Sequence, residues 1–155
     1  MTSPATDGPD GPVFRLLYRS HNLVPEQDRR RVFGEIFTTA RSTNKKLGIT
    51  GALLLTEDVF VQVLEGDETA VRGLLGRIEK DARHDDVVVL TAETVPERVF
   101  SRWAMARVST DGEPDIPLIA GARGITVAAG RGVTKEQEAL LDVMREAAHG
   151  QRHEV

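Results

Sequence analysis

The 155-residue chain contains no cysteine. This absence excludes disulfide frameworks, thiolate nucleophiles and cysteine-ligated zinc sites. Long apolar runs are missing too, because no stretch approaches the roughly 18 apolar residues of a membrane span. The N-terminus also has no basic segment followed by an apolar one, as a signal peptide would. We therefore expect a cytoplasmic protein that is not associated with a membrane.

An excess of positive charge is also absent. The chain has 20 Lys and Arg against 24 Asp and Glu, which gives a formal net charge of −4. This balance excludes binding to nucleic acid through bulk positive charge, and we expect no direct nucleic-acid binding. His21, His149 and His153 have no partner at metal-ligand spacing, so no metal site is expected.

What remains is the composition of an ordinary globular domain, 40% hydrophobic and 28% charged. Residues 1–12 are rich in Pro, Gly and Asp and are predicted to be a disordered tail. The periodicity of the apolar residues and the secondary-structure propensities then predict strands at 14–20, 49–56, 59–65, 87–94 and 103–108. They predict helices at 25–43 and 67–81. Residues 109–133 are predicted to be an irregular linker, because Gly and Pro are frequent in them.

A terminal helix is predicted at 134–149. Thr134 and Gln137 have the spacing of a capping box, and Leu140, Leu141, Met144 and Ala148 form an apolar stripe.

The order β-α-β-β-α-β with one further strand predicts an α+β, ferredoxin-like core over residues 13–108, with two helices on one face of a mixed sheet. The strands at 59–65 and 87–94 carry apolar residues on both of their faces. A sheet face open to water would alternate with polar residues. We therefore expect the second face to be covered by the terminal helix or by a partner subunit.

A few polar or singular residues interrupt the apolar pattern. Gln62 lies on a strand face that is otherwise apolar, and leaving a buried amide unpaired is costly. Tyr18 is the only tyrosine, Trp103 is the only tryptophan, and Met105 shares a strand face with Trp103. Asn44 follows the first predicted helix. Each has a plain structural interpretation, as core packing or, for Asn44, as a helix C-cap. Together they predict one site between the sheet and the helices.

These residues lie in sequence runs that resemble the BLUF family, which are blue-light sensors that bind FAD without a covalent link. The runs are 17–20 (LYRS), 44–53 (NKKLGITGAL), 59–66 (VFVQVLEG), 78–84 (IEKDARH) and 98–105 (RVFSRWAM). The resemblance covers residues 13–108 in the order and spacing of the family.

The resemblance implies roles for the residues of the switch. Tyr18 is similar to the photochemical tyrosine and Gln62 to the switching glutamine of the family. Rearrangement of the Gln62 amide would change a hydrogen bond to the flavin ring and shift its absorption to the red. Trp103 and Met105 match the strand residues proposed to exchange places under light.

The resemblance also implies residues that hold the cofactor. Asn44 is similar to the asparagine that hydrogen-bonds the polar edge of the isoalloxazine ring, and Arg77 and Asp81 match positions that help to hold this edge. His84 matches a histidine near the cofactor. Thr43 departs from the family, because relatives often carry Asn or His there, and one ring contact is expected to be weaker.

We therefore expect a non-enzymatic photoreceptor that signals to an unidentified downstream protein and self-associates as a homo-oligomer, with the terminal helix in a position to carry the output. Two alternatives remain open from the residues. One is a small ferredoxin-like enzyme, an isomerase or monooxygenase, with Tyr18 or His84 as its acid–base group. The other is an interaction module that keeps the fold without the flavin.

Overall fold

A computed structural model describes residues 11–100, 104–108 and 134–153. The regular elements are β1 (Val13–Asn22), the 3-10 turn η1 (Glu26–Asp28), α2 (Arg29–Leu47), β2 (Thr50–Leu55), β3 (Val59–Gly66), α3 (Glu68–Glu79), β4 (His84–Val95), β5 (Ala106–Val108) and α6 (Lys135–His153). Three parts of the sequence predictions lie outside the described residues. They are the first ten residues of the predicted tail at 1–12, the predicted linker at 109–133, and Trp103. No helix in the described ranges is long and apolar enough to span a bilayer.

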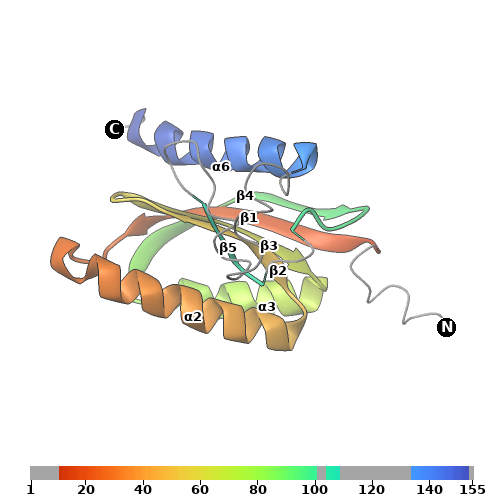
Figure 1. The fold of residues 1–155 in the computed structure, drawn as a ribbon, viewed down its shortest axis with the longest axis horizontal. Coiled ribbons are helices and arrows are strands. Elements are labelled where there is room, and N and C mark those ends of the chain that lie inside the picture. Colours follow the sequence, from red (N-terminus) through yellow and green to blue (C-terminus); the bar gives the residue numbers. More distant parts are fainter. Residues whose placement is uncertain (1–10, 101–103, 109–133, 154–155) are drawn as a thin grey trace.

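The five strands form one sheet in the order β4-β1-β3-β2-β5. All neighbouring pairs are antiparallel except β2 and β5, which run parallel. Helices α2 and α3 lie on one face of this sheet and α6 lies on the other (Figure 1). The ferredoxin-like α+β architecture predicted from the sequence is confirmed, with β5 as the additional strand.

The first long helix ends later than predicted. α2 begins after η1 and continues to Leu47, where Gly48 adopts a left-handed conformation with φ of 70° and ends it. Glycine takes this conformation without the steric cost that a Cβ imposes. Asn44 therefore lies inside the last turn of α2 and is not its C-cap, which corrects the structural interpretation of that residue. The second helix begins as predicted, because the Asp67 side chain accepts a hydrogen bond from Ala70 N.

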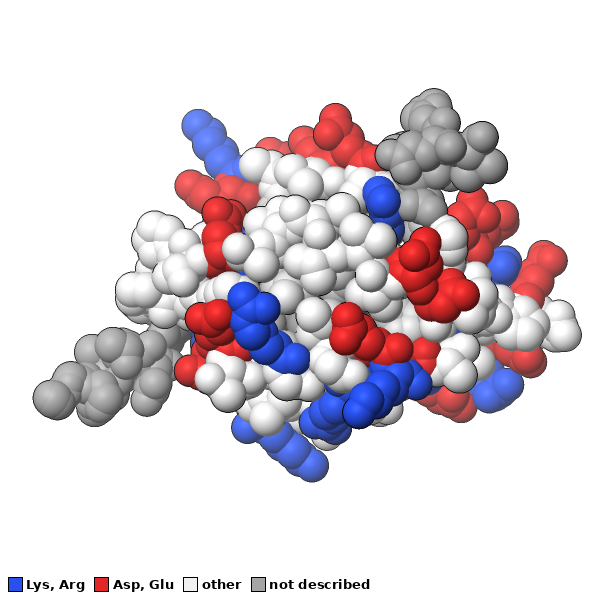
Figure 2. Space-filling view, turned by 180° about the vertical axis from the view of Figure 1, so that it is seen from behind, with Lys and Arg blue, Asp and Glu red and all other residues white. Residues whose placement is uncertain are grey.

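Strand β3 is covered on both faces, as predicted, and all eight of its residues are buried. The same prediction is wrong for β4. Val88, Val89 and Leu90 are 38%, 43% and 38% exposed. The reason is position: β4 is an edge strand, whereas β3 lies in the centre of the sheet. From behind, where β4 lies, the middle of the molecule shows a broad uncharged surface with charged side chains around it (Figure 2).

Helix α6 covers the second face of the sheet. The sequence predicts that either the terminal helix or a partner subunit covers this face. Its start is the predicted capping box, in which Thr134 N donates to Gln137 Oε1 at 3.1 Å and Gln137 N donates to Thr134 Oγ1 at 3.0 Å. Leu141, Met144 and Ala148 are buried against the valines of β3. The helix continues to His153 instead of ending at 149. The single glycine at 150 weakens a helix by only about 1 kcal/mol, which does not force it to end.

Candidate functional site

A cavity of about 270 Å³ lies between the sheet and the helices α2 and α3. The predicted site residues that line it are Tyr18, Asn44, Gln62, Arg77, Asp81 and His84. They come from β1, α2, β3, α3, the turn after α3 and the start of β4. Thr43 also lines the cavity. Residues 66 positions apart in the sequence are thus brought to one site by the crossing of helices over the sheet.

Tyr18 and Gln62 are direct partners. The antiparallel register of β1 and β3 places them opposite one another. Neighbouring side chains on one face of a sheet are close enough to interact. The Tyr18 hydroxyl donates to Gln62 Oε1 at 2.5 Å, and both residues are buried. Burial, with a smaller contribution from the negative charge of Asp81, raises the pKa of the Tyr18 phenol well above its usual value. Tyr18 is therefore a protonated hydrogen-bond donor at neutral pH.

The other end of the Gln62 amide reaches Met105, which immediately precedes β5 and does not lie within the strand as predicted. Gln62 Nε2 contacts Met105 Sδ at 3.5 Å, and Met105 is buried. A thioether sulfur is a weak acceptor. The Gln62 amide is thus held firmly at its oxygen and loosely at its nitrogen, which is the arrangement that a rotating amide needs.

Asn44 connects α2 to the same strand region. Its Nδ2 donates to the carbonyl of Ala104 at 2.7 Å, and its side chain is buried. The carbonyl of Met105 accepts a longer bond, of 3.4 Å, from Arg41 Nε. Asn44 therefore positions the residue that precedes Met105 and lines the cavity at the same time.

An ion pair lies at the rim of the cavity. Arg83 Nη2 lies 2.5 Å from Asp81 Oδ2, and Arg83 Nε donates to both carboxylate oxygens. The side-chain hydrogen bonds from Arg83 lower the pKa of Asp81, and those same bonds raise the pKa of Arg83. Arg77, in the last turn of α3, is exposed at this rim. The sequence analysis did not single out Arg83, although it stands next to His84 in the run shared with the family.

Both ring nitrogens of His84 are engaged. Its Nε2 lies 2.6 Å from the carbonyl of Ile78, which can only accept, so this nitrogen carries a proton. Its Nδ1 lies 2.7 Å from Ser20 Oγ. The ring stacks on Phe60 with centroids 5.4 Å apart. His84 therefore ties α3, β1 and β4 together around the cavity. Ser20 is a supporting residue that the sequence analysis included only as part of the run 17–20.

The donor set of the cavity fits a flavin ring, which is a flat apolar body with a polar edge that both donates and accepts hydrogen bonds. The apolar part of the wall comprises Ile36, Ala40, Leu53, Phe60, Leu74 and Ile78. The polar part includes an amide from Asn44, an amide from Gln62 and the Asp81 carboxylate. Cofactor pockets combine apolar walls with placed polar groups in this way.

Comparison with known families decides the identity of the domain. The family described as "BLUF: Sensors of blue-light using FAD" matches residues 13–106. The chain belongs to the BLUF family. BLUF domains bind FAD, and the predicted resemblance is confirmed.

Curated relatives of this BLUF chain carry further sequence. It is 30% identical over 105 residues to photoactivated adenylate cyclase subunit alpha of Euglena gracilis, covering 68% of this chain and 10% of the relative. It is 32% identical over 90 residues to the blue light- and temperature-regulated antirepressor BluF of Escherichia coli (strain K12), covering 58% of this chain and 22% of the relative. The chain thus spans only a small part of the length of these curated relatives.

Solved BLUF structures match over most of the chain. The dark-state structure of BlrB, a BLUF protein, is 26% identical with a TM-score of 0.63, and the match covers 90% of this chain and 98% of BlrB. The ground state of BlsA is 28% identical with a TM-score of 0.64, covering 86% of this chain and 87% of BlsA.

Proposed function

We propose that this BLUF chain is a blue-light photoreceptor in which FAD occupies the cavity between α2, α3 and the sheet. The observation that carries the proposal is the buried hydrogen bond from Tyr18 to Gln62 on the wall of that cavity. Asn44, Arg77 and Asp81 would hold the polar edge of the ring. When bound, FAD would supply the absorption of blue light and, once excited, a strong oxidant.

The residues of the chain supply the switch. The 2.5 Å bond from the Tyr18 hydroxyl to Gln62 Oε1 is a path along which the phenolic proton leaves when Tyr18 is oxidised. The amide of Gln62 carries both a donor and an acceptor, so half a turn about its last bond presents Nε2 to Tyr18 and Oε1 to the opposite side. The turn costs little on the Met105 side, because only a weak contact to sulfur is lost.

In this proposal the protein passes its signal on through contact with another protein and not through catalysis. Tyr18 is a poor general base because burial raises the pKa of its phenol, and both ring nitrogens of His84 are occupied by Ile78 and Ser20. These observations argue against the acid–base enzyme. We propose a cytoplasmic protein that self-associates and signals to a downstream protein partner. The name of the Escherichia coli relative, an antirepressor, supports an output through protein contacts.

The first test is the absorption spectrum of the purified protein before and after blue light. We expect bound oxidised FAD and a reversible red shift. Tyr18→Phe and Gln62→Leu should retain the flavin and lose the normal red shift. Ser20→Ala is the matched control for Tyr18→Phe, because it removes a hydroxyl from the same face of β1 without touching Gln62, and it should retain the shift. A colourless protein that FAD does not reconstitute would support the interaction module without flavin.

The second test concerns retention of the cofactor. Asn44→Ala removes an amide from the cavity wall and should lower the ratio of FAD to protein after extensive dialysis, with Thr39→Ala as a control on the same helix and cavity wall. An unchanged ratio in Asn44→Ala would contradict the assignment of this residue to the flavin edge.

A further inference from the structure

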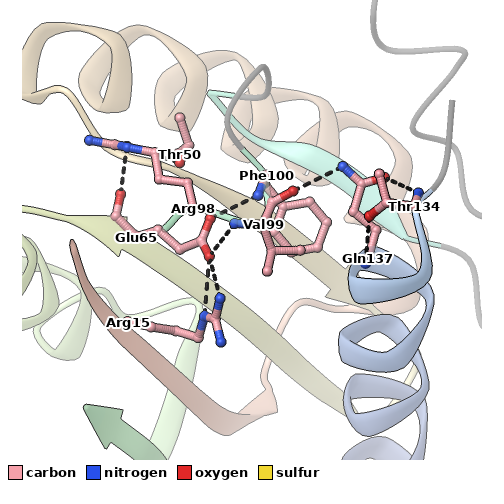
Figure 3. Close-up of polar contacts among 8 residues, drawn as sticks. All are labelled: Arg15, Thr50, Glu65, Arg98, Val99, Phe100, Thr134 and Gln137. Atoms are coloured by element: carbon pink, nitrogen blue, oxygen red, sulfur yellow. Dashed lines mark hydrogen bonds and ion pairs between the residues drawn. The ribbon is translucent and has the colours of Figure 1, made fainter. Parts of the chain in front are cut away.

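Glu65 is a fully buried acidic residue on the strand that carries Gln62. It is 0% exposed and lies on the α6 side of the sheet, whereas Gln62 lies on the cavity side. Its carboxylate accepts from Arg15 Nε at 3.1 Å and from Arg15 Nη2 at 3.0 Å. It also accepts from the backbone N–H groups of Val99 at 2.8 Å and Phe100 at 2.9 Å (Figure 3). Four donors therefore converge on one carboxylate.

Two of these donors belong to a segment without regular structure. Residues 96–100 follow β4 and lie in neither helix nor strand, so no sheet ladder pairs the N–H groups of Val99 and Phe100. Buried backbone groups of this kind need a partner elsewhere. Arg98 adds a further attachment, because its Nη1 donates to Thr50 Oγ1 at 3.0 Å and to the backbone carbonyl of Glu65 at 3.1 Å. The side chain and the backbone of Glu65 thus both fix the segment that contains Val99.

The same segment holds the start of α6. The carbonyl of Val99 accepts a hydrogen bond of 2.9 Å from Gln137 Nε2. Gln137 is buried, and its Oε1 accepts from Thr134 N, so its two ends join the helix cap to the sheet (Figure 3). The Phe100 side chain is fully buried in the core that also contains Leu141 and Met144 of α6. A continuous series of contacts therefore runs from β3 through Val99 and Phe100 to the first turns of α6.

We propose that Glu65 is a positioning residue that anchors the first turn of α6 to β3 through the backbone of Val99 and Phe100. The strand that carries Gln62 then also carries the attachment of α6, and docking of this helix depends on the state of β3. This inference rests on the proposed light-sensing function for its light-dependent part only. The anchoring itself is a property of the dark protein.

The rigidity of β3 links Gln62 to Glu65, so that a change at the first residue reaches the second. β3 is hydrogen-bonded to β1 on one side and to β2 on the other, so it shifts as a unit and not residue by residue. Rearrangement of the Gln62 amide that displaces β3 therefore changes the distances from the Glu65 carboxylate to the Val99 and Phe100 N–H groups. Docked and released α6 are the two states that such a displacement would bias.

The decisive variant is Gln137→Glu, because it separates the helix cap from the anchor. A glutamate at this position still accepts from Thr134 N, so the capping box is kept. It loses the Nε2 donor to Val99 O and at neutral pH places a negative charge next to that carbonyl. Glu138→Gln is the matched control, since it makes the reverse change at the neighbouring, exposed position of α6.

The measurement is hydrogen exchange of the full-length protein in the dark and under blue light, together with the rate at which the red-shifted absorption recovers in the dark. We expect exchange in the first two turns of α6 to become at least tenfold faster in dark Gln137→Glu, with α2 and α3 unchanged. We also expect a smaller difference between light and dark in α6, and a recovery rate changed at least twofold. Glu138→Gln should match the wild type in all three.

Glu65→Gln is the second variant. Its amide nitrogen must face one of the N–H donors that the carboxylate accepts, so it should loosen α6 in the same direction as Gln137→Glu. Wild-type exchange of α6 in both variants would overturn the anchoring role. Faster exchange with an unchanged recovery rate would overturn the coupling to the flavin site. A wild-type protein that shows no red shift would instead reject the proposed function, and the dark exchange data would still decide the anchoring.

Discussion

The two faces of the sheet are built from the same strands but differ in how they use polar residues. The face under α2 and α3 encloses a cavity with Gln62 on its wall. The face under α6 is filled by a continuous apolar core, with Glu65 buried beside it. Gln62 has one strong partner, the Tyr18 hydroxyl, and one weak partner, the Met105 sulfur. Glu65 accepts four N–H bonds.

The two residues therefore differ in how tightly their partners fix them: the Gln62 amide is fixed firmly at one end only, whereas the Glu65 carboxylate is fixed by four donors. An amide whose donor end meets only sulfur loses little when it turns, whereas a carboxylate with four donors cannot leave without orphaning them. Strand alternation makes this division possible, because residues at odd and even positions of β3 point to opposite faces. One strand thus combines an amide that has one strong and one weak partner with a carboxylate that has four donors, three residues apart.

The largest effect is expected from removing the fixed group. Glu65→Leu leaves the Arg15 guanidinium and two backbone N–H groups without their acceptor, and it should lower the free energy of unfolding by roughly 3–5 kcal/mol. Gln62→Leu orphans only the Tyr18 hydroxyl and should cost about 1–2 kcal/mol. Denaturation with urea in excess FAD, followed by circular dichroism, compares the two. The contrast between the faces would be refuted by a Gln62→Leu cost equal to that of Glu65→Leu.

A double substitution tests the cause of the Glu65 effect. Arg15→Met combined with Glu65→Leu removes both charges, and an apolar replacement of a buried ion pair is often tolerated better than loss of one partner. The double variant should therefore be more stable than Glu65→Leu alone. A double variant that is no more stable than Glu65→Leu would show that the unpaired Arg15 is not the cause, and the cost would then belong to the Val99 and Phe100 N–H groups.

The next effect concerns the filled face. Leu141 is 1% exposed against the core of β3, whereas Val143 on the same helix is 46% exposed. Leu141→Ala should cost about 2–4 kcal/mol, because it leaves a cavity in a packed core. Val143→Ala should change stability by no more than about 0.5 kcal/mol. Similar unfolding midpoints for the two variants would show that α6 is not docked as a part of the core.

Much of this arrangement was accessible from the sequence, because the signals were local. The period of the helical residues, the Thr134–Gln137 box and the alternation around Gln62 each depend on neighbours in the chain. The role of Glu65 was not accessible, since its partners are 34 and 35 positions away on a segment without periodicity. Tyr18, Asn44 and Gln62 stood out from the residue pattern, whereas Arg77, Asp81 and His84 came from the family resemblance. The structure brings all six to one cavity.

The pH dependence of stability tests whether the Tyr18 phenol is buried on the cavity face. Burial raises the pKa of Tyr18 above the ordinary phenol value near 10. The native protein therefore binds more protons than the unfolded chain above pH 10. The stability that Tyr18 contributes is fully present below pH 10 and is lost above it, by about 1.4 kcal/mol per pH unit. Tyr18→Phe should lack this additional loss.

Because Tyr18 is the only tyrosine, phenolate absorbance in the ultraviolet reports on it directly. Folded protein should show no phenolate signal at pH 10, and unfolded protein should show one. A folded protein that ionises near pH 10 would mean that the phenol is open to water, and the Tyr18–Gln62 bond would then not be buried.

The smallest effect is expected at β4, for which the prediction of two covered faces is wrong. An apolar run such as 87–90 has the same composition in a central strand and in an edge strand, so periodicity cannot place it. Val61 and Val88 make the comparison direct, because both are paired with Arg19 and lie in one row across the α6 face. Val61 is 0% exposed and Val88 is 38% exposed. Val61→Thr buries a hydroxyl and should cost about 1–3 kcal/mol, while Val88→Thr should change stability by less than about 0.5 kcal/mol. Urea denaturation over a range of protein concentrations measures both. If Val88→Thr costs as much as Val61→Thr, and more at high concentration, the edge strand is covered by a second copy in solution, and the two strands are equivalent after all.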